Sequence, residues 1–226
     1  MVPDQPLAVW PLCAGRALLR MLAVLMLFAL LVKWGAFRSI DAHVGRWVGS
    51  CWTPEGERIS RAVTFFGSTP WLLIAGGLMS GWWMRQGHAE LIGLFWGGIA
   101  LGLLVQGITR LSVLQWRPES QLAVLAASSF WPPYEFAGFP SGHAFRSAYL
   151  CAWWSHTRSQ QRGWWASLAV VGCQGVAFGV GITRVYLNRH WMTDVLGGWL
   201  VAGISYAAAW TWWLTAHNAQ RQTRRR

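Results

Sequence analysis

Long apolar runs without charged residues dominate the chain. A helix needs about 20 mostly apolar residues to cross the hydrocarbon core of a bilayer. Six runs approach or reach this length, at residues 16–37, 62–84, 91–109, 143–157, 163–183 and 195–216. The fourth is the weakest candidate, because Arg146 lies within it. The pattern therefore predicts an all-α fold, a bundle of six transmembrane helices.

Two longer connections separate these runs, at residues 38–61 and 110–140. We expect both to be loops. The second contains Pro118, Pro132, Pro133 and Pro140, and proline disfavours a continuous helix. No internal repeat, low-complexity tract or linker divides the chain. We therefore predict one membrane domain over residues 1–226.

Composition supports a membrane protein over a soluble one. Hydrophobic residues make up 54% of the chain and charged residues 12%, about half the charged share of a typical soluble domain. The 19 Trp and 10 Phe also suit a bilayer, since aromatic rings collect at the headgroup level. The net charge is +11, but the sequence contains no soluble module with a basic face that could bind nucleic acid, so we expect no nucleic-acid partner. The four cysteines are scattered, which indicates neither a zinc site nor a disulfide framework.

Arginines beside the six runs suggest an orientation, because cytoplasmic ends of spans carry an excess of basic residues. With the N-terminus inside, nine arginines flank the inner side and eight the outer side. Setting aside Arg110, Arg117 and Arg184 as candidate functional residues leaves nine against five. We therefore expect both termini in the cytoplasm.

Three short polar stretches stand at the ends of the predicted helices. They are Arg110-x6-Arg117-Pro118, Pro140-Ser141-Gly142-His143 and Thr183-Arg184-x5-His190-x3-Asp194. Counting crossings places all three on the same side of the membrane. Ionisable residues at membrane level are expensive to keep, so we expect the three stretches to form one functional pocket.

His190 and Asp194 have the spacing of an oriented nucleophile. If His190 opens the sixth helix, Asp194 lies one turn later on the same face. The carboxylate can then accept the Nδ1 proton of the imidazole and leave Nε2 free to attack phosphorus. A helix-end pair that only satisfies its own hydrogen bonds is the structural alternative.

Phosphoryl transfer also needs fixed donors around the phosphate oxygens. Arg110, Arg117 and Arg184 offer fork-shaped donors, although arginines at helix ends also anchor lipid headgroups. Arg146 lies one turn deeper, where a charge is costly without a partner. We expect it to bind a second phosphate or a headgroup, or else to pair with a carbonyl or with Glu135.

The Pro140-Ser141-Gly142-His143 stretch predicts an anion site at a helix start. Ser141 and the backbone N–H groups of Gly142 and His143 would point at a phosphate there, and glycine lets the backbone come close. The alternative is a plain N-cap turn. His143 itself suits a general acid for the leaving oxygen and afterwards a base for water.

Taken together, the three stretches resemble the signature of the type 2 phosphatidic acid phosphatase (PAP2) superfamily, which reads K-x6-RP, PSGH and SR-x5-H-x3-D. The matching residues run from Arg110 to Asp194 in the same order and with the same internal spacings. Two positions depart from the pattern. Arg110 stands where the superfamily usually has Lys, and Thr183 replaces the usual Ser.

The resemblance implies six transmembrane helices and a mechanism without metal or cofactor. It implies His190 as the nucleophile, oriented by Asp194, with His143 as the general acid. The implied phosphate ligands are Arg117, Ser141, Gly142 and Arg184. In bacterial members it implies an active site that faces the periplasm or the exterior, so we expect a multi-pass protein of the bacterial inner membrane.

The motifs bind the phosphate and not the lipid tail, so they leave the substrate open. Undecaprenyl diphosphate is our first expectation, with phosphatidylglycerophosphate, phosphatidate and lipid A phosphates as alternatives. A lipid phosphotransferase of the same superfamily is a second enzymatic alternative. A catalytically inactive transporter or structural protein belongs to another class, and intact His143, His190 and Asp194 argue against it.

Overall fold

The computed structural model describes residues 9–118, 137–159 and 164–223. Apart from an isolated bridge between Trp116 and Ala137, its regular structure is helical, which confirms the all-α class. The elements are α1 (Val9–Lys33), α2 (Arg38–Ser50), α3 (Pro54–Thr64), the 3-10 turn η1 (Phe65–Gly67), α4 (Thr69–Arg85), α5 (Glu90–Val113), α8 (Gly142–Ser159), α9 (Trp164–Tyr186) and α10 (Met192–Thr223).

The segment 38–61 is helical, so its prediction as a loop is wrong. It forms α2 and most of α3, which are short and carry many polar side chains. Thr53 caps α3 by accepting a hydrogen bond from the N–H of Gly56 at 3.0 Å, and Pro54 occupies the first turn. A search for long apolar runs cannot detect helices of this kind. Of the second predicted loop, residues 119–136 lie outside the described residues, including Pro132, Pro133 and Glu135.

The second predicted span is interrupted at Ser68. Its backbone is extended there, and its hydroxyl caps α4 by accepting from the N–H of Trp71 at 3.3 Å. The segment Pro54–Gly67 and the helix Thr69–Arg85 consequently meet at an angle of 47°. A helix cap does not change hydropathy, so the scan for apolar runs cannot detect this break within residues 62–84. Residues 62–67 thus belong with α3 and η1 rather than with α4.

Three described helices are long and apolar enough to cross a membrane, or four if the bent pair forms one span. The three are Gly15–Lys33, Glu90–Val113 and Trp164–Tyr186. The helices α8 and α10 do not meet the same criterion. The reason differs between them: α8 carries His143, Arg146 and other polar residues, whereas α10 is rich in Trp, Gly and Thr, which contribute little to mean hydropathy.

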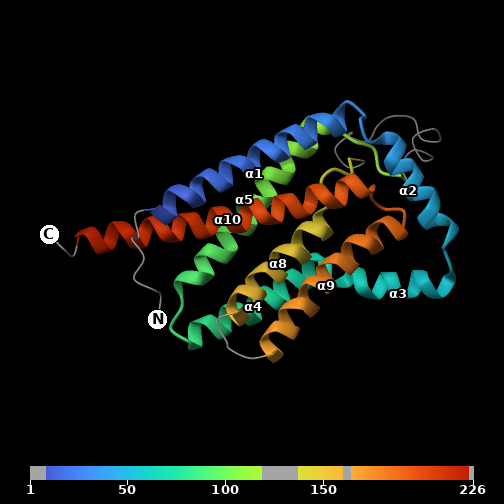
Figure 1. The fold of residues 1–226 in the computed structure, drawn as a ribbon. Helices are drawn as coiled ribbons and strands as arrows, with labels where there is room; N and C mark the ends of the chain where they lie inside the picture. Colours follow the sequence, from blue (N-terminus) through green and yellow to red (C-terminus); the bar gives the residue numbers. More distant parts are fainter. Residues whose placement is uncertain (1–8, 119–136, 160–163, 224–226) are drawn as a thin grey trace.

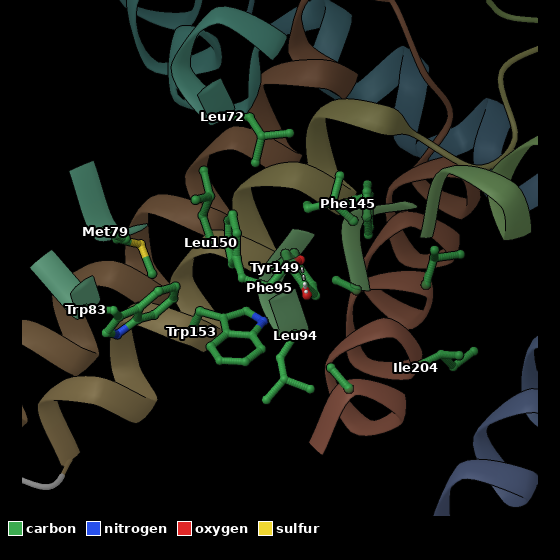
Figure 2. Close-up of a cluster of buried hydrophobic side chains, with 14 of the residues drawn as sticks. Leu72, Met79, Trp83, Leu94, Phe95, Phe145, Tyr149, Leu150, Trp153 and Ile204 are labelled. Carbon is green, nitrogen blue, oxygen red and sulfur yellow. Dashed lines mark hydrogen bonds between the residues drawn. The ribbon is translucent and has the colours of Figure 1, made fainter. Parts of the chain in front are cut away.

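A buried aromatic stripe on α8 forms the centre of the core (Figure 2). Phe145, Tyr149 and Trp153 are four residues apart and fully buried, so they share one face of the helix. The hydroxyl of Tyr149 donates to the carbonyl of Phe95 in α5 at 2.9 Å. Around this stripe α8 contacts α4, α5, α9 and α10. Because protein surrounds α8, it can carry polar residues on other faces.

The helix ends that carry the polar stretches meet at one end of the bundle (Figure 1). The end of α5, the start of α8, the end of α9 and the start of α10 lie there, beside α2. The described start of α1 and the far end of α10 lie at the opposite end. The fold therefore brings three sequence segments, far apart along the chain, to a common location.

Candidate active site

His190 lies in the turn between α9 and α10. The N–H groups of Arg189 and His190 both donate to the carbonyl of Arg184, at 3.0 and 3.1 Å, which closes the turn after α9. Asn188 takes the left-handed conformation that this turn needs, with φ of 54°. The helix α10 begins at Met192, two residues later than the start at His190 that the spacing predicts. His190 therefore stands before the helix and not within it.

Asp194, in the first turn of α10, holds the imidazole of His190. Its Oδ2 lies 3.1 Å from Nδ1 of His190 and also accepts the N–H of Trp191 at 3.0 Å. The His190 side chain is 4% exposed and Asp194 is fully buried. With Nδ1 donating to the carboxylate, the lone pair of the ring is on Nε2. The pair thus has the arrangement of an oriented nitrogen nucleophile.

The start of α8 packs directly on the first turn of α10. The N–H of Ser141 donates to the carbonyl of Asp194 at 2.8 Å. Gly198 allows this approach, because a Cβ there would lie 2.5 Å from the carbonyl oxygen of Ser141. The hydroxyl of Ser141 is fully buried and has no hydrogen-bond partner among the described residues. These contacts fix the position of Gly142 and His143 relative to Asp194.

Four guanidinium groups and two imidazoles line one cavity of about 440 Å³. Arg110 comes from the last turn of α5 and Arg184 from the last turn of α9, so their charges lie at helix C-termini. Ser141 and Asp194 are fully buried and do not line it. The lining residues are Leu103, Gln106, Gly107, Arg110, Arg117, Gly142, His143, Arg146, Arg184 and His190.

Three of these arginines are held by separate elements of the fold. Arg184 donates through a terminal nitrogen to the hydroxyl of Thr64 at 3.2 Å, and Arg110 lies 3.4 Å from the carbonyl of Pro140. The Nε of Arg146 donates to the carbonyl of Gly67 at 2.8 Å. The segment α3–η1 therefore supports two guanidinium groups of the cavity.

Arg146 also contacts the imidazole of His143. A terminal nitrogen of Arg146 lies 3.4 Å from Nδ1 of His143. Because arginine can only donate, Nδ1 must be the acceptor, and the proton of a neutral His143 is then on Nε2. The expected pairing of Arg146 with a carbonyl is thus present through Nε at Gly67, and Arg146 also lines the cavity. Pairing with Glu135 lies outside the described residues.

The family model of the PAP2 superfamily matches residues 92–218, which is more than half of the chain. The chain belongs to the PAP2 superfamily. The PAP2 signature stretches lie within the matched region, so the resemblance noted from the motifs is confirmed. The protein is accordingly a multi-pass membrane protein and a lipid phosphatase of the hydrolase class.

The fold is also that of a solved PAP2 protein. The crystal structure of a transmembrane PAP2-type phosphatidylglycerolphosphate phosphatase from Bacillus subtilis matches with a TM-score of 0.61. The match covers 88% of this chain and 96% of the Bacillus chain, at 19% sequence identity. At this identity the likeness concerns the fold alone. A comparison with curated proteins finds no match.

Several residues of this PAP2 site are not apparent from the motifs. Gln106 lines the cavity and lies one turn before Arg110, so the helical spacing from Arg110 could have indicated it. Thr64 and Gly67 are far away in sequence, and no pattern marks them as partners of the cavity arginines. Among the described residues, no three His, Cys, Asp or Glu side chains are grouped to hold a metal ion.

Proposed function

We propose that this PAP2 phosphatase removes phosphate from a membrane lipid phosphate or diphosphate through a phosphohistidine on His190. The observation that supports this most is the hydrogen bond between His190 Nδ1 and Asp194 Oδ2, 3.1 Å long, at the wall of an arginine-lined cavity. A histidine held in this way presents Nε2 to a bound phosphoryl group. The proposal assigns the three motif stretches to one reaction.

The first step is attack of the Nε2 lone pair of His190 on phosphorus. A P–N bond forms, and the P–O bond to the lipid alkoxide or to the lipid phosphate breaks. For this step His143 must carry a proton on both nitrogens, which requires the Arg146 guanidinium to leave Nδ1 of His143 for the bound phosphate. Protonated His143 then gives its Nε2 proton to the departing oxygen and becomes neutral, so that a neutral or singly charged group leaves. Asp194 stabilises the positive charge that develops on the His190 ring.

The second step is hydrolysis of the phosphohistidine. Water attacks phosphorus, His143 takes its proton as a base, and the P–N bond breaks to release inorganic phosphate and free His190. Throughout, Arg110, Arg117 and Arg184 would stabilise the equatorial oxygens of the phosphoryl group. Gly142, which lines the cavity at the start of α8, would add its backbone N–H to these donors, and the hydroxyl of Ser141 beside it, unpartnered among the described residues, would support the same anion site.

The cavity favours a substrate with more than one phosphate. Arg146 brings a fourth guanidinium to the cavity beyond the three in the signature stretches. This supports undecaprenyl diphosphate as the first substrate, with phosphatidylglycerophosphate and phosphatidate as alternatives. Arg146→Ala should therefore lower turnover of a prenyl diphosphate more than that of phosphatidate. Equal losses on the two substrates would remove the preference for a diphosphate.

We further propose that α8 and α10 cross the bilayer together with the apolar helices, which gives six spans. Both termini are then cytoplasmic, and the cavity faces the periplasm across the bacterial inner membrane. Single cysteines at Ser50 and Gln86, in a chain without its native cysteines, test this topology. An impermeant thiol reagent should label intact cells at position 50 and not at position 86. Labelling at position 86 alone would reverse the orientation.

The activity itself is tested with a panel of lipid phosphates and diphosphates in detergent. We expect release of inorganic phosphate without an acceptor lipid, persistence in a chelator, and loss in His190→Ala. Phosphate release only when an acceptor is added would support the phosphotransferase. No release from any lipid phosphate by the wild-type protein would contradict the proposal and favour the binding or transport alternative.

A further inference from the structure

Asp41 is a buried carboxylate outside all three motif stretches. It lies in the first turn of α2 and is 3% exposed. Its Oδ1 accepts the N–H of Thr193 at 3.1 Å, and its Oδ2 accepts the hydroxyl of Thr193 at 2.6 Å. Gln115 adds a longer contact, 3.4 Å from its amide nitrogen to Oδ2. One carboxylate of α2 thus binds the first turn of α10 at two points.

The residue that Asp41 binds stands next to the proposed catalytic pair. Thr193 directly precedes Asp194, and the N–H groups at the start of a helix have no partner within that helix. Asp194 binds the N–H of Trp191, and Asp41 binds that of Thr193. The first turn of α10 therefore has two carboxylate caps, one from its own sequence and one from α2.

Asp41 occupies this position at an electrostatic cost. Burial raises the pKa of Asp41 above its ordinary value, the hydrogen bonds from Thr193 oppose that rise, and the nearby charge of Asp194 adds to it. A cap made by a neutral side chain would avoid this cost. The two hydrogen bonds from Thr193 offset part of this cost and hold the carboxylate against the first turn of α10.

We propose that Asp41 is a positioning residue that fixes the first turn of α10, so that Asp194 holds His190 in line with the bound phosphate. This inference rests on the proposed function of His190. Asp41 does not line the arginine cavity, and its hydrogen bonds among the described residues go to Thr193 and Gln115. Its loss should act on the attack of Nε2 and leave phosphate binding almost unchanged.

The surroundings of Asp41 allow this role to be separated from folding. Asp41 borders a second cavity of about 440 Å³, which also includes the exposed residues Lys33 and Arg38. In Asp41→Ala, water from this cavity can reach the N–H of Thr193 and replace the lost acceptor. We therefore expect the variant to fold, with a looser first turn of α10.

The test compares Asp41→Ala, Asp41→Asn and the control Glu90→Ala. Glu90 starts α5 and pairs with His88 at 3.5 Å on the exposed surface, so its loss removes an acidic group elsewhere. For each purified variant one measures kcat on a lipid phosphate, the inhibition constant of inorganic phosphate, and thermal unfolding. Misplacing a reacting group by about 1 Å can cost about 100-fold in rate.

We expect Asp41→Ala to lose about 10- to 100-fold in kcat, with the phosphate inhibition constant within about twofold of wild type. Asp41→Asn should recover most of the rate, because its Oδ1 can accept from the N–H of Thr193 and its amide can donate to the Thr193 hydroxyl. An Asp41→Ala rate equal to that of Glu90→Ala would overturn the inference. A parallel loss of kcat, phosphate binding and folded protein in Asp41→Ala would also overturn it.

If the wild-type protein itself shows no lipid phosphatase activity, the proposed function is wrong and this inference is wrong with it.

Discussion

Gly138 offers a steric test of the catalytic pair. It lies just before the cis Phe139–Pro140 bond, and a Cβ at this position would lie 2.5 Å from Oδ2 of Asp194. The glycine cannot easily move away, because its N–H donates to the carbonyl of Gln115 at 2.7 Å. The neighbouring residues Ala137 and Phe139 are also buried. Gly138→Ala should therefore displace the carboxylate and not the loop.

The size of the displacement follows from the contact distances. To restore ordinary contact at 3.4 Å from 2.5 Å, the Asp194 oxygen must retreat by about 0.9 Å. The same oxygen holds Nδ1 of His190 at 3.1 Å, so this hydrogen bond lengthens beyond its useful range. A misplacement of about 1 Å costs about 100-fold in rate, which corresponds to about 2.7 kcal/mol of barrier.

The assay is kcat for phosphate release, with Gly97→Ala as the matched control. A Cβ at Gly97 meets no atom within 4 Å, so the control adds the same methyl group to open space. We expect Gly97→Ala to keep wild-type turnover and Gly138→Ala to lose about 100-fold. Wild-type turnover in a folded Gly138→Ala protein would refute the role of the Asp194–His190 contact in the rate.

Three further predictions concern single contacts. Arg110→Lys should retain most activity on a lipid phosphate and Arg110→Ala should not, because the site needs the charge; equal losses in kcat/KM would contradict this. Thr64→Val should raise KM by about fivefold with little change in kcat, since Arg184 loses an acceptor, whereas Thr64→Ser should match wild type. Tyr149→Phe should lower stability by about 1 kcal/mol without changing kcat, measured by thermal unfolding in detergent; an unchanged Tm would show that the bond to Phe95 contributes nothing.

Sequence pattern predicts the long helices well because apolar length is a direct requirement of the bilayer. It predicts the break at Ser68 and the helices α2 and α3 poorly, since these depend on caps and polar faces. The helix α8 is a special case. Arg146 makes it the weakest candidate span from sequence, and the structure surrounds it with four other helices.

For the site, the three motif stretches indicate His143, His190, Asp194 and the signature arginines, because residues only a few positions apart at a helix start are neighbours in space; His190 lies in the turn before α10 and still reaches Asp194. The supporting residues could not be predicted in this way. Asp41 reaches Thr193 across 152 residues, and Gly138 matters only because Asp194 packs against it. Such contacts arise from how the helices pack together, and no local pattern in a single sequence indicates them.

The central claim is that His190 carries the phosphoryl group during turnover, and trapping that intermediate tests it most directly. Wild-type protein is mixed with a phosphorus-labelled lipid phosphate, quenched in alkali and digested, and the labelled peptide is identified. A phosphohistidine is stable in alkali and labile in acid. We predict such a label on the peptide that contains His190, and its absence in His190→Ala. Intact turnover with a label on another residue, or with no labelled protein at any time, would contradict the account.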